Sequence, residues 1–256
     1  MRYTKKIVFL LCCSVVILSA LAFYYKRGWD TVDGQLREIS NDVDSINMIM
    51  HDLGGLYGRT RSGIILTQLH SQDENLIVMF GDSIVEQMYF PETAGYNVIN
   101  SGVSGARALE SLPFLQKVLA ASHGPAVVLS IGANDALGDK VATPEDFAAG
   151  YEALAKAVRQ SGRALVLVTL PPMEPEKFTA VKFDYTRVAD YNAAIREVGR
   201  RTGAVVAEVH DAIDAWRKGR PGGFTVDGVH LGAQAAALWR QIVYAAVARA
   251  LPANAQ

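Results

Sequence analysis

The sequence predicts a three-layer α/β domain built on a parallel sheet, and three observations lead to this prediction. From about residue 75 onward, apolar runs of strand length alternate with segments of helical periodicity. Most of the runs are nearly continuous Val, Leu and Ile, which is typical of parallel strands covered on both faces. Short motifs with glycine and polar residues follow these runs, beyond the carboxyl ends of the strands, where sites form in such sheets.

Strands and helices are expected in alternation along this part of the chain. The expected strands are Leu76 to Phe80, Asn97 to Ile99, Ala126 to Ile131, Ala164 to Leu170 and Ala204 to Val209. The expected helices are Ala108 to Ala121, Pro144 to Ser161, Arg187 to Arg201 and a last one from about Leu231 to Leu251. Thr143 directly before Pro144 is typical of an N-capped helix start.

Composition limits the class of protein. Half of the 256 residues are hydrophobic and a fifth are charged, which is ordinary for a globular protein. The formal net charge of −1 argues against a nucleic-acid partner. Cys12 and Cys13 lie in the apolar N-terminal segment, so the rest of the chain has no disulfide, cysteine nucleophile or thiolate metal site. His51, His70 and His123 have no carboxylate-histidine spacing that suggests a metal site, and we expect no metal and no cofactor.

The N-terminal residues 1–27 are predicted to be a membrane anchor. Three basic residues precede 19 uncharged ones, Ile7 to Tyr25, and that length just crosses a hydrocarbon core. The basic residues favour a cytoplasmic N-terminus with the remaining chain outside, in the periplasm of a Gram-negative source. A cleaved signal peptide is the alternative, because Ala20-Leu21-Ala22 is an acceptable cleavage site. We favour the anchor, since the apolar run continues beyond that site, and expect export in either case.

Residues 28–74 are predicted to be an amphipathic helical stalk or linker before the α/β domain, residues 75–256. Apolar residues recur three and four positions apart, on one stripe of a helix: Trp29, Val32, Leu36, Ile39, Val43, Ile46, Met50 and Leu53. One interpretation is a stalk that forms a homodimer beside the membrane. The other is a helix packed on the α/β domain of its own chain, which we favour because few complementary charges flank the stripe and Gly34 weakens the helix.

Four short motifs carry the chemistry of the α/β part. In chain order they are Gly81-Asp82-Ser83-Ile84, Ser104-Gly105, Gly132-Ala133-Asn134-Asp135 and Asp227-Gly228-Val229-His230. Each motif alone has an ordinary structural explanation, such as a capping serine or a flexible loop. Together they supply a nucleophile, oxyanion donors, and a base with its orienting acid. That set is complete for hydrolysing an ester through a covalent acyl-enzyme.

Each of the reactive side chains has a physical reason for its place. Ser83, at a strand-to-helix turn, presents its hydroxyl near a helix N-terminus, where negative charge is favoured. Its motif is not Gly-x-Ser-x-Gly, so the nucleophile elbow of the α/β-hydrolases is excluded. The Asn134 amide can donate to a developing oxyanion, an effect of about 3 kcal/mol. His230 can take the proton of Ser83, and Asp227, three positions earlier, can hold the imidazole tautomer.

Neighbouring residues are expected to have structural roles. Asp82 and Asp135 are expected to hold their loops rather than to react, and Asp211 to cap the helix that contains Trp216. Pro171-Pro172-Met173, after the fourth strand, is expected to shape one wall of the cleft.

The four motifs resemble the sequence blocks of the SGNH hydrolases, also called GDSL esterases and lipases, over roughly residues 75–251. The resemblance implies a flavodoxin-like sheet of five parallel strands and no metal. The catalytic residues it implies are Ser83 as nucleophile, His230 as base and Asp227 as the acid that orients the base. It implies an oxyanion hole formed by the Ser83 and Gly105 backbone N–H groups and the Asn134 side chain. Gly102 is an alternative to Gly105, which matches the family's block better.

The sequence therefore predicts an exported serine esterase that removes an acyl group from a hydroxyl, and acetyl is the acyl group we expect. An outward site beside a membrane suits an envelope or exopolysaccharide ester as substrate. One alternative is an O-acyltransferase, in which a sugar hydroxyl captures the acyl-enzyme. A lysophospholipase or lipase is another, since an anchor would hold the site near a bilayer. The lack of a long apolar lid in the loops disfavours a triacylglycerol lipase. The last is a non-catalytic scaffold of a membrane polysaccharide assembly, with the stalk helix as its interaction surface.

Overall fold

A computed structural model describes residues 18–19, 21–35, 37, 55–71, 76–137, 141–177, 184–218 and 223–251. The chain divides into two compact units, Met1–Gly55 and Leu56–Gln256. In the first unit residues 21–35 are helical, and Trp29 and Val32 of the predicted stripe are exposed. The other six stripe residues and most of the predicted anchor lie outside the described residues, so the anchor and the homodimer stay predictions. No helix among the described residues is both long and apolar enough for a membrane span.

Five parallel strands form one sheet in the order β2-β1-β3-β4-β5. Their bounds are Leu76–Gly81 for β1, Asn97–Gly102 for β2, Ala126–Ser130 for β3, Ala164–Val168 for β4 and Val205–Ala207 for β5. This is the flavodoxin-like order of doubly wound sheets, so the predicted sheet is confirmed. β2 runs three residues further than expected, because Asn100, Ser101 and Gly102 pair in register with the end of β1. These three residues are polar or glycine, so the apolar pattern did not predict that the strand continues through them.

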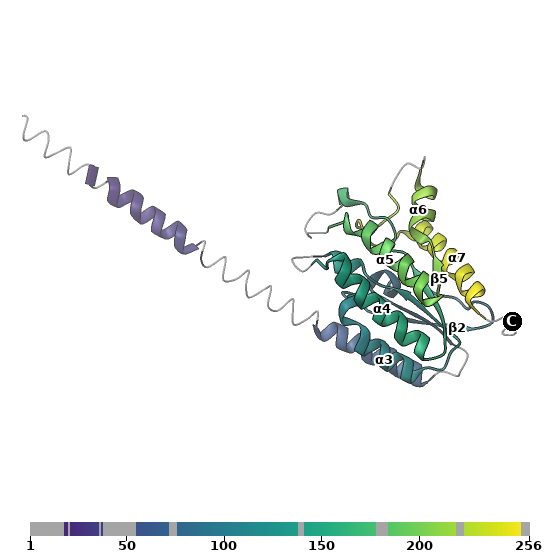
Figure 1. Ribbon diagram of the computed structural model, residues 1–256. Coiled ribbons are helices and arrows are strands. Elements are labelled where there is room, and N and C mark those ends of the chain that lie inside the picture. Colours follow the sequence, from purple (N-terminus) through teal and green to yellow (C-terminus); the bar gives the residue numbers. More distant parts are fainter. Residues whose placement is uncertain are drawn as a thin grey trace, which may run out of the picture. The chain divides into compact units, whose positions relative to one another are not determined.

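Helices cover both faces of the sheet and complete the three layers. Their bounds are Ser83–Glu86 (α2), Leu112–Ala121 (α3), Pro144–Gln160 (α4), Arg187–Thr202 (α5), Val209–Arg217 (α6) and Ala233–Ala250 (α7). Three short 3-10 turns are Ala108–Glu110 (η1), Ala133–Ala136 (η2) and Pro175–Lys177 (η3). Helices α3, α4 and α5 lie side by side (Figure 1), whereas α7 packs on β3, β4 and β5.

Two details of the helices show which local signals were reliable. Thr143 caps α4 as predicted, with its hydroxyl oxygen 3.1 Å from the backbone N–H of Asp146. The expected helix from Ala108 to Ala121 is broken into η1 and α3, because Pro113 has no N–H to continue the helical hydrogen bonds. The expected cap at Asp211 is wrong. Helix α6 begins two residues earlier, and the Asp211 carboxylate accepts a hydrogen bond from Arg196 at 3.0 Å.

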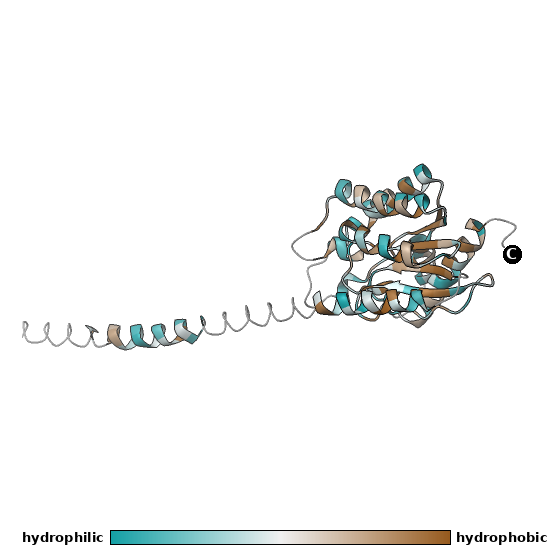
Figure 2. Ribbon diagram, turned by 90° about the horizontal axis from the view of Figure 1, so that it is seen from below, coloured by the Kyte–Doolittle hydropathy of each residue, from teal (hydrophilic) through white to brown (hydrophobic). Residues whose placement is uncertain are grey.

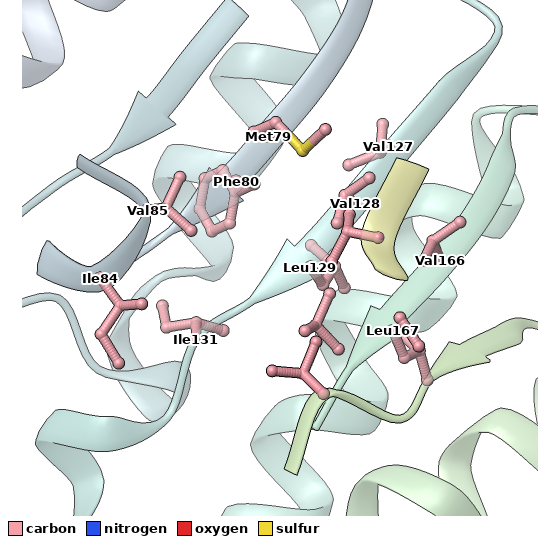
Figure 3. Close-up of a cluster of buried hydrophobic side chains, with 14 of the residues drawn as sticks. Met79, Phe80, Ile84, Val85, Val127, Val128, Leu129, Ile131, Val166 and Leu167 are labelled. Atoms are coloured by element: carbon pink, nitrogen blue, oxygen red, sulfur yellow. The ribbon is translucent and has the colours of Figure 1, made fainter. Parts of the chain in front are cut away.

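The hydrophobic core lies against the central strands. Every residue of β1 and β3 is buried, which explains their uninterrupted apolar sequences. Figure 3 shows side chains of β1, β3 and β4 packed together with Ile84 and Val85 of α2 and with Ile131. Hydrophobic strands lie between helices that turn hydrophilic residues outward (Figure 2). Trp239 of α7 is fully buried, with its ring 5.9 Å from that of Phe90.

The helix over residues 55–70 belongs, from Leu56 onward, to the same unit as the sheet. Ile65 and Leu69, four positions apart on one helix face, are 0% and 2% exposed. The guanidinium of Arg61 donates to the carbonyl oxygens of Asn100 at 2.8 Å and Gly102 at 3.0 Å. Backbone groups at a sheet edge need partners, and this helix supplies one. The compact unit thus starts at Leu56, whereas the sequence suggested a catalytic domain from residue 75.

Candidate active site

Ser83 is the first residue of α2, where the chain turns sharply at the end of β1. The turn requires glycine at position 81, because a Cβ there would lie 2.3 Å from the carbonyl oxygen of Ser130 and from Val85. Asp82 is the N-cap residue, and its Oδ1 accepts from the backbone N–H of Ile84 at 3.0 Å. The Ser83 side chain is therefore presented at the start of a helix, beyond the carboxyl end of β1.

His230 lies between Ser83 and Asp227, although 147 positions separate it from the serine. Its Nε2 is 2.8 Å from Ser83 Oγ, and its Nδ1 is 2.6 Å from Asp227 Oδ2. A neutral imidazole that donates from Nδ1 to the carboxylate leaves Nε2 as the acceptor for the serine proton. Both distances are within hydrogen-bond reach, which a general base requires.

Asp227 remains ionised at neutral pH. Burial raises the pKa of its carboxyl group. Hydrogen bonds from the His230 ring and from the backbone N–H groups of His230 and Val229 outweigh that effect, so the pKa lies below its usual value. The two backbone bonds reach Asp227 Oδ1 at 2.9 and 3.1 Å and form the one-turn return that the three-residue spacing predicts.

The loop that carries Asp227 and His230 is held by Glu174, which follows β4. Glu174 Oε2 accepts from the backbone N–H of Phe224 at 3.1 Å and of Thr225 at 2.7 Å, and also from the Thr225 hydroxyl. The ammonium group of Lys177 lies 2.7 Å from the same oxygen. One carboxylate oxygen thus gathers the donors of the loop just before Asp227.

Burial raises the pKa of Glu174, but the donors from Lys177, Thr225 and Phe224 outweigh it and lower the pKa to about 2. The backbone N–H of Glu174 also donates to the carbonyl oxygen of Gly228 at 2.9 Å. Sequence reasoning did not select Glu174. A glutamate after an apolar run is too common a pattern to have indicated its partners. Pro171, Pro172 and Met173, directly before it, are buried.

The chain after β2 forms a tight turn from Val103 to Ala106. The N–H of Ala106 donates to the carbonyl oxygen of Val103 at 3.0 Å, and Gly105 has φ +80°, as the third residue of a type II turn requires. Gly105 is exposed on this turn. Gly102, the alternative donor, is buried and its N–H donates to Asn100 Oδ1 at 3.0 Å. The geometry therefore favours Gly105 over Gly102.

Asn134 lies in η2, beyond the end of β3, beside the same turn. Its Nδ2 donates to the carbonyl oxygen of Ala106 at 2.9 Å. A side-chain amide carries two N–H groups, so this bond aligns the amide and leaves a second hydrogen for another acceptor. Asn134 and Gly105 are thus held on neighbouring loops.

Two buried aspartates join these loops, as the sequence analysis expected. Asp82 Oδ2 accepts from the backbone N–H groups of Gly132 and Ala133, each at 3.2 Å. Burial raises the pKa of Asp82 to about 6 despite its three backbone donors. Asp135 accepts from the N–H of Ala108 at 2.8 Å, and burial also raises its pKa. Both carboxylates accept hydrogen bonds from the backbone of the loops, which fits a structural role.

Other candidates stand apart from this cluster. The His210 ring lies 3.2 Å from Asp211 in the first turn of α6. Among the described residues no group of three or more His, Cys, Asp or Glu side chains could hold a metal ion. A cavity of about 600 Å³ lies along the outer edge of β2, lined by Arg61, Glu86 and Glu92 among others.

Comparisons with known proteins agree with this arrangement. The model of the GDSL-like Lipase/Acylhydrolase family matches residues 79–238. Curated proteins give no match.

Many solved structures share the fold. A lipase/acylhydrolase from Enterococcus faecalis is 22% identical, with a TM-score of 0.56 over 70% of this chain and 97% of its own. The acetylxylan esterase Axe2 from Geobacillus stearothermophilus is 15% identical, with a TM-score of 0.55 over 68% of this chain and 94% of its own. LAE5, an alpha/beta hydrolase enzyme from the metagenome of Lake Arreo, is 18% identical, with a TM-score of 0.56 over 70% and 98%.

Proposed function

Because the chain belongs to the GDSL-like lipase/acylhydrolase family of serine ester hydrolases, we propose that it removes acyl groups, acetyl in the first instance, from hydroxyl groups of a glycan. The observation that carries the proposal is the unbroken contact from Ser83 through His230 to Asp227. We assign Ser83 as the nucleophile, His230 as the base and Asp227 as the acid that orients it.

In the first half of the reaction, Ser83 Oγ attacks the ester carbonyl carbon while His230 Nε2 accepts the hydroxyl proton. Negative charge develops on the carbonyl oxygen. The backbone N–H groups of Ser83 and Gly105 and the free amide hydrogen of Asn134 receive that charge. The tetrahedral intermediate then collapses, and His230 returns the proton to the leaving alcohol. An acyl-enzyme on Ser83 remains.

In the second half, water takes the place of the alcohol. His230 accepts a proton from the water as its oxygen attacks the acyl carbon, and the same donors hold the oxyanion. Collapse releases the carboxylic acid and returns the proton from His230 to Ser83. Asp227 stays ionised throughout and stabilises the imidazolium that forms in each half.

The choice of an acetylated glycan has two supports. Several structural neighbours are structures of an acetylxylan esterase, and at 14–15% identity they share only the fold with this chain. The N-terminal segment is the second support, because an outward-facing anchored enzyme meets envelope or exopolysaccharide esters. We therefore also propose that the catalytic unit lies outside the cytoplasm, as a single-pass protein of the inner membrane.

A hydrolysis series on the full chain tests the activity. p-Nitrophenyl acetate, butyrate and octanoate should be hydrolysed with a preference for acetate, and Ser83→Ala should be inactive. A fluorophosphonate probe should label the wild type and not Ser83→Ala. Preference for octanoate would favour a lipase or lysophospholipase. A folded protein that neither labels nor turns over would contradict the esterase and favour the scaffold alternative.

Acetylated xylan, with and without an added xylo-oligosaccharide acceptor, separates hydrolysis from transfer. Release of free acetate in both cases supports the hydrolase. Acetylation of the acceptor, with little free acetate, would favour the O-acyltransferase that uses the same residues. For localisation, external protease should remove the catalytic unit from spheroplasts while cytoplasmic proteins stay intact. A protected catalytic unit would contradict the outward orientation.

A further inference from the structure

Glu86, the last residue of α2, connects the proposed oxyanion turn to the helix over residues 55–70. On one side, Glu86 Oε2 accepts from the hydroxyl of Ser104 at 2.6 Å and from the backbone N–H of Ser104. Both polar donors of Ser104 thus reach one carboxylate oxygen. Ser104 directly precedes Gly105, whose N–H is the donor assigned to the oxyanion.

On the other side, the helix over residues 55–70 holds the second carboxylate oxygen. The hydroxyl of Tyr57 donates to Glu86 Oε1, and Arg61 Nε lies 3.4 Å from the same atom. The Arg61 and Glu86 side chains are only 18% and 12% exposed, so solvent screens this ion pair weakly. The hydrogen bond to Glu86, burial and the charge of Glu86 raise the pKa of Tyr57, so the phenol keeps its proton and remains a donor.

The geometry of the turn links the contact between Glu86 and Ser104 to the direction of the Gly105 N–H. The N–H of Gly105 belongs to the peptide group between Ser104 and Gly105. Type I and type II turns differ by a flip of that central peptide, which reverses the direction of its N–H. Gly105 at φ +80° has the type II form. The two bonds to Glu86 hold the Ser104 N–H and hydroxyl, and so anchor the residue from which the Ser104–Gly105 peptide extends. With Ser104 fixed and Gly105 in its type II conformation, the direction of the Gly105 N–H is set.

We infer that Glu86 is a positioning residue that holds the Ser104–Gly105 peptide in its oxyanion-binding orientation, and that the helix over residues 55–70 supports it through Tyr57 and Arg61. The inference rests on the proposed esterase mechanism, because that mechanism assigns Gly105 its role. Arg61 also binds the carbonyl oxygens of Asn100 and Gly102, so one side chain supports both Glu86 and the strand that leads into the turn.

The expected decrease in kcat of the Glu86 variants follows from the contribution of the Gly105 N–H as an oxyanion donor. Removing one oxyanion donor costs about 10²- to 10³-fold in kcat. A misdirected donor is weakened rather than lost, so we expect Glu86→Ala to lower kcat about 30- to 100-fold with KM within about twofold. Glu86→Gln retains an acceptor for Ser104 but loses the charge that pairs with Arg61. We expect about a 3- to 10-fold decrease for it.

The test uses the full chain, with kcat and KM for p-nitrophenyl acetate and the melting temperature of each variant. Glu92→Ala is the matched control, because Glu92 is an exposed carboxylate that lines the same cavity as Glu86. Hydrogen exchange measured by mass spectrometry on a peptide spanning residues 100–108 reports the order of the turn directly. This readout does not depend on turnover.

The expected result is a graded loss of kcat from Glu86→Gln to Glu86→Ala, with faster exchange confined to residues 100–108 and no change for Glu92→Ala. A kcat for Glu86→Ala within twofold of the wild type would overturn the inference. Equal acceleration of exchange in all peptides would overturn it too, because it shows general destabilisation. If the wild type has no turnover, the proposed function fails, and exchange at residues 100–108 alone decides whether Glu86 holds the turn.

Discussion

The two halves of the proposed catalytic machinery are held in different ways. Ser83, Gly105 and Asn134 follow β1, β2 and β3, three neighbouring strands whose carboxyl ends meet at one edge. Asp227 and His230 lie instead in the segment between α6 and α7. The two sides of that loop are joined by an isolated bridge between residues 225 and 231, and Glu174 and Lys177 bind the loop to the segment after β4.

Because of this difference, changes on the two sides are expected to affect stability and catalysis to different extents. On the nucleophile side, strand register sets the geometry, and buried Asp82 joins two of the loops. A change there is expected to disturb the fold as well as the site. On the base side, one carboxylate gathers the loop, so a change at Glu174 is expected to misplace the base while the sheet stays intact.

The largest expected effect is the loss of the nucleophile itself. Ser83→Ala should lower kcat by about 10⁴-fold or more, since the hydroxyl that forms the acyl-enzyme is gone. The melting temperature should stay close to that of the wild type, because the substitution removes a single oxygen atom and alanine fits the space of the buried serine. Steady-state hydrolysis of p-nitrophenyl acetate and a thermal melt measure both. A folded, active alanine variant would remove Ser83 from its role.

Asn134→Ala should lower kcat about 10²- to 10³-fold with little change in KM, because it removes a donor that acts on the transition state. Asn134 donates to Ala106 from an adjacent loop, so a small loss of stability is expected as well. Kinetics and a denaturant titration distinguish the two effects. An increase in KM with unchanged kcat would show that Asn134 binds substrate uniformly and is not an oxyanion donor.

Glu174→Gln tests the base side. The amide keeps the size of the side chain but loses the negative charge. In the wild type that charge binds four donors from Lys177, Thr225 and Phe224. We expect kcat to fall about tenfold as the base is displaced, which is less than the loss of a reacting group. Lys156→Gln, which removes a surface ion pair, is the control. Unchanged kcat would mean that the loop keeps its place without Glu174.

The pH dependence of stability should have opposite signs on the two sides. The pKa of Asp82 is raised by burial to about 6, so its unfavourable contribution appears as the pH rises from about 4 to 6, and stability falls over that window. The pKa of Glu174 is lowered to about 2, so its favourable contribution is present above about pH 4.5 and is lost as the pH falls toward 2.

Denaturant titrations of the wild type, Asp82→Asn and Glu174→Gln between pH 3 and 8 measure these slopes. Asp82→Asn should remove a decrease of about 3 kcal/mol between pH 4 and 6, from a shift of roughly two pKa units. Glu174→Gln should instead flatten the curve below pH 4.5. Identical slopes in the wild type and both variants would show that neither carboxylate titrates as its surroundings require.

The sequence by itself determined the strands in their chain order and the parallel sheet, and it indicated which residues to propose for the site. It could do so because those signals are local: buried strands are continuous apolar runs, and the motifs sit at strand ends or in a three-residue return. Pro113 inside an expected helix shows the limit of that reasoning. The periodicity continued through it, but the missing N–H broke the helix into η1 and α3.

Only the tertiary structure decided how the site is supported. Glu174 meets Thr225 across 51 positions, and Tyr57 meets Glu86 across 29, in segments with no shared periodicity. The second compact unit begins at Leu56, because Ile65 and Leu69 are buried in the core and Arg61 binds the backbone at the edge of β2. A buried carboxylate is stable only when donors surround it, and those donors come from wherever the fold brings the chain together.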